Sequence, residues 1–410
     1  MEEKRNVPNL RFPGFTDSWE QRRLGEVAHR VTRKNEEGMS DLPLTISAQH
    51  GLVDQRDFFN SQVASRDMRG YFLLERGEFA YNKSTSSDSP WGAIKRLTEY
   101  EKGCLSTLYI CFGLDEGDPD FLVTYYETSR WHRGIRMIAA EGARNHGLLN
   151  IAPGDFFETE LTLPGKIEEQ TAIGALFAKL DSLIALHQRK LDHVKELKKG
   201  LLQKMFPKEG ANVPELRFPG FTDPWEQRRL GELVEETYGG GTPKTSVPEY
   251  WGGDIPWIQS SNVIEGELFN IDIPKAITDK GLRESAAILI PGSSIAVVTH
   301  VGVGKLVYLP FSFTTSQDFV SLSRLKTNSI FLCYALFWRL QTEINIVQGS
   351  AIKGITKAEL LDKRIDIPHD VEQTQIGAFL QKLDSLIALH QRELDHVKEL
   401  KKGLLQQMFV

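Results

Sequence analysis

The chain is poor in cysteine and has no surplus of positive charge. Its 410 residues include 3 cysteines, and none of them has Cys-x-x-Cys or Cys/His spacing. These facts exclude a disulfide framework and a zinc site of the usual kind. The formal net charge is −6, whereas a stand-alone nucleic-acid binder is usually basic. Nucleic-acid binding therefore requires either a local cluster of basic residues or partner subunits that neutralise phosphates.

Long apolar runs are also missing. The first residues, MEEKRNVPNLRF, contain no apolar signal segment, and no later stretch approaches the roughly 18 apolar residues of a membrane span. We therefore expect a cytoplasmic protein without membrane contact. The apolar and charged contents of 40% and 25% are those of a folded protein. The length predicts two domains.

Two segments of the chain occur twice. The arm NVPNLRFPGFTDSWEQRRLGE, Asn6 to Glu26, returns almost unchanged as Asn212 to Glu232, and the segment Glu169 to Phe206 returns as Glu372 to Phe409. The parts between them differ. A period of about 200 residues is too long for a solenoid and indicates a duplicated domain. We expect a first domain at 1–167, a first helix at 168–206, a second domain at 207–371 and a second helix at 372–410.

The two dissimilar domains share weak landmarks. The segment at Asp41, DLPLTIS, can be laid beside DIPWIQS at Asp254, and each domain ends in Gly-x4-Gly, at Gly142 to Gly147 and Gly349 to Gly354. Short strand-like runs such as LYICFGL, ILIPGSSIAVV and FVSLSRL alternate with helical stretches such as DFLVTYYETSR and FLCYALFWRLQTEI. We predict a mixed α+β fold for both domains.

The repeated C-terminal segments have the apolar spacing of long helices. Two matching stripes in one chain can bury each other as an antiparallel coiled coil, although each helix could instead pack on its own domain. The histidines in the stripe lack a second ligand at i+4, so we interpret them as seam residues rather than metal ligands. The lysines near the helix end could face DNA, but we expect them to be solvated or to contact another subunit. The seam residues are Leu180, Ile184, His187, Leu191, Val194, Leu383, Ile387, His390, Leu394 and Val397, and the lysines are Lys195, Lys198, Lys199 and Lys204.

Motifs for catalysis are absent from the sequence. No Asn-Pro-Pro-Tyr/Phe motif, S-adenosylmethionine loop, HExxH or GxSxG occurs. Gly302 to Lys305 resembles the end of a phosphate-binding loop, but Thr299 and Leu306 occupy positions where that motif needs Gly and Ser/Thr. Gly239 to Lys244 could be an anion cradle or a plain loop. We expect no catalytic residues and no bound metal.

The chain resembles the specificity subunits of type I restriction–modification systems along essentially its whole length. The similarity lies in GGTPKTSVPEYWGGDIPWIQSSNV, Gly240 to Val263, in the RFPGF…WE…LGE arms and in the EQxxIG…LDxLI…LKKGLLQxMF helices. The first domain departs from the pattern, because Glu36 to Ser47 replaces the Gly-Gly-Thr-Pro opening.

The resemblance implies two DNA target-recognition domains, joined by two long antiparallel coiled-coil helices in a pseudo-two-fold repeat. Each domain would read half of a bipartite target in double-stranded DNA. The helices would set the spacer and dock two methyltransferase subunits, which bind S-adenosylmethionine and methylate adenine N6. Motor–nuclease subunits would use ATP and Mg²⁺. This chain would hold no cofactor itself.

Polar loop residues are the candidate readers of DNA bases, because Arg or Lys can pair with guanine and Asn or Gln with adenine. An ordinary turn role stays open for each of them. Those of the first domain are Gln49, His50, Asn82, Lys83, Ser84, Ser87, Arg144, Asn145 and His146, and those of the second are Thr242, Lys244, Gln259, Ser260, Ser261, Asn262, His300, Lys305 and Lys353.

Three other functions fit parts of the sequence: a two-headed DNA-binding regulator, a coiled-coil adaptor that binds proteins, and a self-contained methyltransferase. Steep salt dependence of DNA binding by the assembled complex would exclude the adaptor. Co-purification with a methyltransferase would separate the specificity subunit from the regulator. If the chain were a self-contained methyltransferase, the purified chain alone would methylate DNA.

Overall fold

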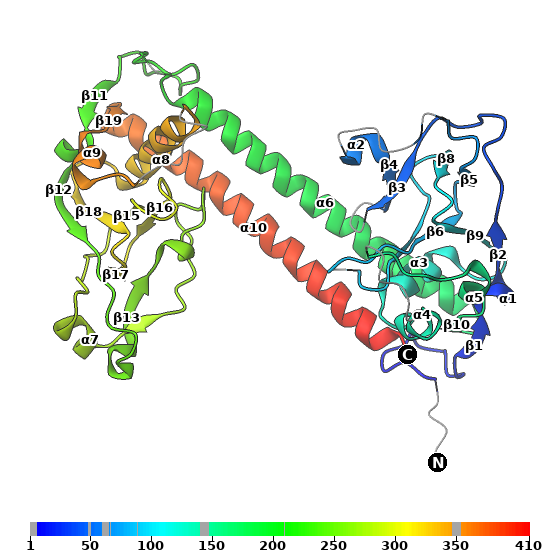
Figure 1. Ribbon diagram of the computed structural model, residues 1–410. Coiled ribbons are helices and arrows are strands. Elements are labelled where there is room, and N and C mark those ends of the chain that lie inside the picture. The colour runs from blue at the N-terminus through cyan, green and yellow to red at the C-terminus, as the bar shows by residue number, and fades with distance from the viewer. Residues whose placement is uncertain are drawn as a thin grey trace. The chain divides into compact units, whose positions relative to one another are not determined.

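The computed structural model describes residues 6–47, 51–59, 65, 67–87, 89–139, 147–208, 210–346 and 354–410. Its contacts divide the chain into unit 1, Met1–His187 with Glu393–Val410, and unit 2, Gln188–Arg392. Each unit therefore contains one globular domain and helical residues from both repeats, which are labelled in Figure 1.

Two helices of 39 residues dominate the repeated segments: α6, Ile167–Met205, and α10, Asp370–Met408. Both carry acidic residues in the first turn, where the helix dipole favours negative charge. Glycine inside them allows close packing on a neighbouring helix. A Cβ on Gly174 would lie 2.6 Å from the backbone N of Phe121, and one on Gly377 would lie 3.2 Å from that of Phe331.

Unit 1 is built on a four-stranded antiparallel sheet with the order β2-β9-β6-β7. The described residues of the unit also form three two-stranded sheets, β1-β10, β3-β4 and β5-β8, and five short helices. The central strands are β2 Ala28–Val31, β6 Phe79–Asn82, β7 Ala93–Arg96 and β9 Ile110–Leu114. The others are β1 Glu20–Arg23, β3 Leu44–Ser47, β4 Gly51–Asp54, β5 Phe72–Glu75, β8 Lys102–Leu105 and β10 Glu160–Leu163. The helices are α1 Leu24–Val27, α2 Gln55–Phe59, α3 Pro119–Glu127, α4 His132–Ile138 and α5 Pro153–Phe157.

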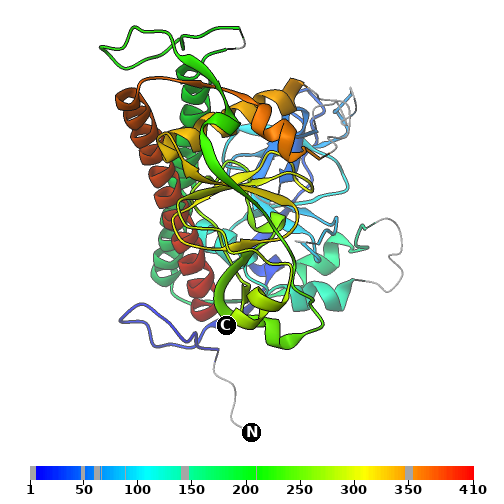
Figure 2. The same cartoon turned by 90° about the vertical axis from the view of Figure 1, so that its left-hand side faces the viewer.

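Unit 2 has a sheet of the same kind, with the order β12-β18-β15-β16. Strand β13 lies between β14, which is antiparallel to it, and β17, which is parallel. In Figures 1 and 2, α8 and α9 lie at one end of the unit, and α7 lies with β13 at the opposite end. The strands are β11 Glu226–Arg229, β12 Val234–Gly239, β13 Trp251–Ile258, β14 Ala276–Ile277, β15 Ser294–Val298, β16 Leu306–Leu309, β17 Thr314–Thr315, β18 Phe319–Leu325 and β19 Arg364–Ile367. The α-helices are α7 Asp279–Glu284, α8 Ser329–Ile346 and α9 Lys357–Asp362, and the 3-10 helices are η1 Leu230–Glu232, η2 Pro248–Tyr250 and η3 Ser260–Asn262.

The two sheets have matching topology, which confirms the predicted mixed α+β fold and its internal repeat. In each unit the arm strand pairs with the strand before the long helix: β1 with β10, and β11 with β19. The aligned landmarks also agree. Pro43 forms a parallel bridge with Cys104, and Trp257 pairs in parallel with Thr314. Dissimilar sequences therefore build the same framework.

The core of unit 1 includes the end of α10. The Phe409 ring stacks on Phe121 with centroids 5.6 Å apart and lies edge-on to Trp19 at 5.8 Å. It also contacts Phe177 of α6 at 6.0 Å. The arm therefore packs against a helix end, and the far end of the chain completes the first domain.

The same arrangement occurs in unit 2 with the end of α6. Phe206 stacks on Phe331 at 5.8 Å and lies edge-on to Trp225 at 6.0 Å. Phe206 is thus the counterpart of Phe409. Each domain closes its core with the last residues of the helix that begins after the other domain.

Ion pairs within each unit show that the helices run antiparallel. In unit 1, Lys401 of α10 donates to Asp181 of α6, and in unit 2, Lys198 of α6 pairs with Asp384 of α10. Lys198 is 7% exposed, so our expectation of a solvated or subunit-contacting lysine was wrong at this position. Its ammonium group lies 5.6 Å from the centroid of the Tyr334 ring, and its charge is neutralised by Asp384 from the other repeat.

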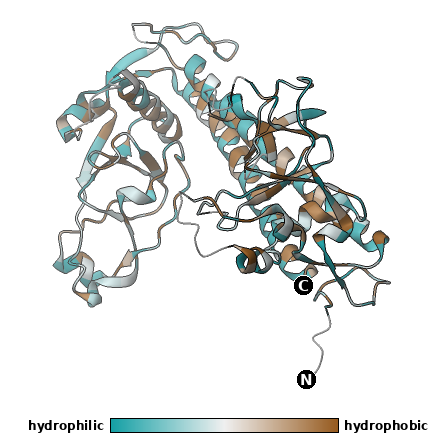
Figure 3. Cartoon of the chain, turned by 45° about the vertical axis from the view of Figure 1, so that its right-hand side comes forward, coloured by the Kyte–Doolittle hydropathy of each residue, from teal (hydrophilic) through white to brown (hydrophobic). Residues whose placement is uncertain are grey.

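The predicted seam residues lie on the less exposed side of both helices. Leu191 and Leu394 are each 1% exposed. Leu180 and Leu383 are also buried, whereas Ile184, Val194, Ile387, Val397 and the two histidines are half-buried. Nδ1 of His187 lies 3.2 Å from a carboxylate oxygen of Glu393. Apolar and polar residues alternate along the helices in Figure 3.

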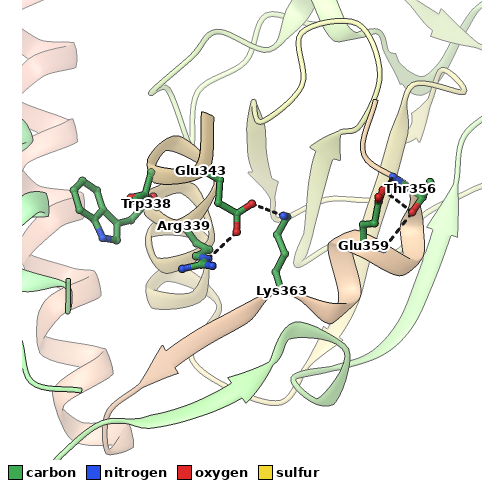
Figure 4. A network of polar contacts seen from close by, with 7 residues as sticks. Trp338, Arg339, Glu343, Thr356, Glu359 and Lys363 are labelled. Carbon is green, nitrogen blue, oxygen red and sulfur yellow. Dashed lines mark hydrogen bonds and ion pairs between the residues drawn. The ribbon is translucent and has the colours of Figure 1, made fainter. Parts of the chain in front are cut away.

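A polar network joins α8 to α9 in unit 2 (Figure 4). Glu343 accepts a hydrogen bond from Arg339 at 2.8 Å and a second from Lys363. Helix α9 begins with a capping box, in which Thr356 and Glu359 satisfy each other's backbone N–H groups. The network fixes the chain that leads into β19.

Two expectations from composition concern the chain as a whole. Cys104, Cys111 and Cys333 are free and buried. Among the helices of the described residues, none combines the length and apolar character needed to cross a bilayer.

Candidate nucleic-acid interface

Three separate chain segments meet at one loop cluster of unit 2. The amide of Ser316, directly after β17, donates to the carbonyl of Ile258 at the end of β13, at 2.8 Å. The amide of Gly241 donates to the carbonyl of Thr315 at 2.8 Å. These bonds bring the Gly-Gly-Thr-Pro segment beside the ends of two strands.

The glycines of this segment are required by close packing. A Cβ on Gly240 would lie 1.9 Å from the carbonyl oxygen of Ser316, and one on Gly241 would lie 2.0 Å from that of Ala286. No side chain fits at either position. The N–H of Gly241 already donates to Thr315, so it is unavailable to the anion cradle that the sequence suggested.

Within this loop cluster, the side chains of Thr242 and Gln317 form a hydrogen bond between two segments that are distant in the sequence. The hydroxyl of Thr242 donates to Oε1 of Gln317 at 2.7 Å. Gln317 is exposed, and our sequence analysis missed it. The available signal was a glutamine in a short polar link, TTSQD, between two strand-forming runs. Lys244 lies nearby in the chain and is also exposed.

Gln259 and Asn262 have a structural role at the end of β13. Their side chains and backbone N–H groups form a reciprocal capping box around η3. The ordinary turn role that we left open is therefore real for both. Ser260 is half-buried and Ser261 is exposed within the same turn.

His300 and Lys305 lie on the hairpin between β15 and β16. The residue before His300, Thr299, is tied to the β17–β18 link, since its amide donates to the carbonyl of Asp318 at 2.8 Å. Gly302 and Gly304 have φ values of 86° and 90°. The segment is therefore a glycine turn in a hairpin that presents a lysine, unlike a phosphate-binding loop, which links a strand to a helix.

The described candidates of unit 1 follow the end of β6. The carbonyl of Lys83 accepts from the amide of Leu149 at 2.9 Å, and the amide of Thr85 donates to the carbonyl of Gly147 at 2.6 Å. Ser84 forms an isolated bridge with Leu148. Burial lowers the pKa of Lys83, whose ammonium group lies 3.4 Å from the carbonyl of Ile151. Asn82 accepts from the amide of Ser84 at 3.0 Å, and Ser87 is exposed.

The two units hold these loops in the same way. Strand β6 of unit 1 and strand β15 of unit 2 both lie third in their sheets. The loop after β6 binds the second glycine of the first Gly-x4-Gly at Gly147, while Thr299 after β15 binds Ile355, directly after the second such motif, at 2.7 Å. The candidate loops are therefore equivalent in position although their sequences differ. Gln49, His50, Arg144, Asn145, His146 and Lys353 lie outside the described residues.

A family model for the type I restriction modification DNA specificity domain matches residues 222–399. The type I restriction enzyme MjaIX specificity subunit of Methanocaldococcus jannaschii is 26% identical over 190 residues, which are 45% of this chain and 44% of that protein. The putative MjaX specificity subunit of the same organism is 25% identical over 247 residues, 58% and 56% of the two chains. The EcoR124I/EcoR124II specificity subunit of Escherichia coli is 26% identical over 196 residues, 43% and 47%. The chain spans about half the length of these curated relatives.

Two solved structures share the fold. The type I restriction–modification system S subunit from M. genitalium has a TM-score of 0.63 at 13% identity, with 98% of this chain and 99% of that one covered. A chain from structures describing complex assembly and conformational transition of the type I R-M system has a TM-score of 0.52 at 19% identity, with the same coverage.

Proposed function

Since this chain belongs to the family of type I restriction–modification specificity subunits, we propose that it selects the DNA sequence for a methyltransferase complex and performs no catalysis itself. Each unit recognises one half of a bipartite target in double-stranded DNA. The long helices set the unread spacer between the halves. The family model matches a DNA specificity domain at residues 222–399, and the proposal assigns the same role to both repeats.

One observation carries this proposal: a duplicated frame presents dissimilar polar loops at equivalent positions. The end of β6 and the loop after it offer Asn82, Lys83 and Ser84. The corresponding hairpin after β15 offers His300 and Lys305. Because base readout depends on a few side chains in the grooves, such loops suit a protein that reads two unlike half-sites.

The helices suit a partner that binds twice. Leu197 and Leu400 occupy equivalent positions in the repeats and are 45% and 46% exposed. Leu186 and Leu389 form a second exposed pair, at 39% and 42%. Matching apolar residues on two copies of one helix favour two copies of one partner, which we take to be methyltransferase subunits carrying S-adenosylmethionine. Motor–nuclease subunits would bring ATP and Mg²⁺ to the complex.

Methylation mapping tests the proposal. The chain is co-expressed with its methyltransferase subunit, and methylated adenines are mapped by single-molecule sequencing with and without this gene. We expect a two-part motif that appears only when the chain is present. Replacing Asn82 and Ser84 with alanine should alter one half of the motif, whereas replacing His300 and Lys305 should alter the other. Methylation by the purified chain alone, or a motif independent of the chain, would contradict the assignment.

A further inference from the structure

Gln317 lies on a rigid link between two sheets of unit 2. The residue before it, Ser316, is bonded through its amide to Ile258 of β13. The residue after it, Asp318, accepts two hydrogen bonds from Thr299 through its carbonyl, at 2.8 and 3.0 Å. The backbone is therefore fixed on both sides of Gln317, while the side chain itself is exposed.

Thr242 fixes the orientation of the Gln317 side chain. Its hydroxyl donates to Oε1 at 2.7 Å, which identifies that atom as the acceptor and points Nε2 away from Thr242. Within the described part of the chain, no residue pairs with the second lone pair of Oε1 or with the two N–H groups of Nε2, so these remain for another molecule. A side chain held before binding loses less entropy on binding.

The exposed amide suits one base in particular. In the major groove adenine presents an acceptor at N7 and a donor at N6, and glutamine pairs with both atoms at once. Resting on the proposed function, we propose that Gln317 reads an adenine in the half-site of unit 2 and that Thr242 is its positioning residue.

The equivalent position in unit 1 has different chemistry. Gln317 stands three residues before Val320, which pairs with Val297 of β15 in the core cluster that includes α8. Its counterpart is Thr107, three residues before Ile110, which pairs with Tyr81 of β6 in the corresponding cluster of unit 1. Thr107 is exposed and carries a hydroxyl group in place of an amide. This position therefore differs between the repeats, as a specificity-determining residue must when the two half-sites are unlike.

Variants of Gln317 test the inference in the co-expression system, with Gln227→Ala as the control for an exposed glutamine of the same unit. Gln317→Ala should relax one adenine of the wild-type motif, with discrimination falling on the order of tenfold to a hundredfold. The other half-site and the spacer should stay unchanged. Gln317→Glu should shift the preference at that position toward cytosine, because a carboxylate accepts from cytosine N4. Thr242→Val should give a smaller relaxation at the same base.

Two results would overturn the inference. An unchanged motif in Gln317→Ala means that the side chain reads no base. A uniform decline at every site means that Gln317 contacts phosphate, which carries no sequence information, and co-purification of the assembled complex checks that the variant folds. Either result leaves the proposed function intact, because that proposal fails only if the wild-type chain directs no methylation.

Discussion

Arg217 of the second arm donates two hydrogen bonds to the Glu372 carboxylate of α10, from Nε at 2.7 Å and from Nη2 at 2.8 Å. The pair recurs in unit 1 as Arg11 and Glu169, at 2.6 and 2.7 Å. Both glutamate side chains are 1% exposed. Hydrogen bonding to Glu372 raises the pKa of Arg217. The repeated arm thus fastens each domain to the start of its own long helix.

Removing this arginine should destabilise the unit that contains it. Arg217→Ala leaves the Glu372 carboxylate buried and unpaired, which we expect to lower the free energy of unfolding by about 3 kcal/mol. Arg217→Lys should restore only part of the lost stability, because lysine supplies the positive charge but cannot bind a carboxylate through two parallel hydrogen bonds. Thermal unfolding measures the effect.

The matched control is Arg229→Ala. Arg229 pairs with Asp362 at 3.1 Å, and both side chains are more than 60% exposed, so its removal should cost less than about 1 kcal/mol. Equal losses from Arg217→Ala and Arg229→Ala would show that burial of the pair is unimportant.

The exchange of helix ends gives a second prediction. Phe409→Ala should remove about 3–5 kcal/mol of stability from unit 1, because the ring contacts Trp19, Phe121 and Phe177. Hydrogen exchange should accelerate in β6 and β9 and stay slow in β15 and β18. Phe206→Ala should reverse the pattern.

Lys402→Ala tests whether the effect belongs to the aromatic ring. The side chain of Lys402 is 65% exposed, so this variant should leave exchange in both sheets nearly unchanged. If Phe409→Ala accelerated exchange in unit 2 instead, the assignment of the C-terminus to unit 1 would be wrong.

The helices and the fold class could be predicted because their signals are local or repeated. Apolar spacing in α6 and α10 is visible within each segment, and duplication supplied a partner for each stripe. Lys198 shows the limit of that reasoning. A lysine in an amphipathic pattern reads as a solvated residue, and only Asp384, from the other repeat, explains its burial.

The candidate interface could be predicted only in part for the same physical reason. Polar loops are visible in the sequence, but their positions depend on strand pairing, which local patterns do not give. Gln317 and Thr242 are 75 residues apart, so nothing near either residue reveals their contact. Conversely, Gln259 and Asn262 were selected for their amide groups, although these groups also cap η3.

The buried cysteines predict a pH effect. Burial raises the pKa of the Cys111 thiol to about 12, compared with about 8.5 in an unfolded chain. The contribution of the buried Cys111 thiol to stability is therefore complete below about pH 8.5 and is lost as the pH rises toward 12.

Iodoacetamide should label Cys111 slowly in the native protein at pH 8, and mass spectrometry identifies the labelled peptide. Cys104 and Cys333, whose pKa values burial also raises, should behave similarly. We expect the cysteines to be labelled rapidly only in denaturant. Rapid labelling of the native protein would contradict their burial.

The proposed spacer role can be tested by lengthening both helices. Four residues inserted after Gln188 of α6 and after Gln391 of α10 add about 6 Å, and because four residues are close to one turn, the apolar stripe keeps its direction. At about 3.4 Å per base pair, the unread spacer should grow by one or two base pairs. The insertions fall between Asp181 and Lys198 on α6 and between Asp384 and Lys401 on α10, so the ion pairs within each unit are retained. Four residues inserted after Gly210, beyond the end of α6, serve as the control and should leave the spacer unchanged. Methylation mapping reports spacer and half-sites together, so altered bases with a constant spacer would show that the helices do not set the distance.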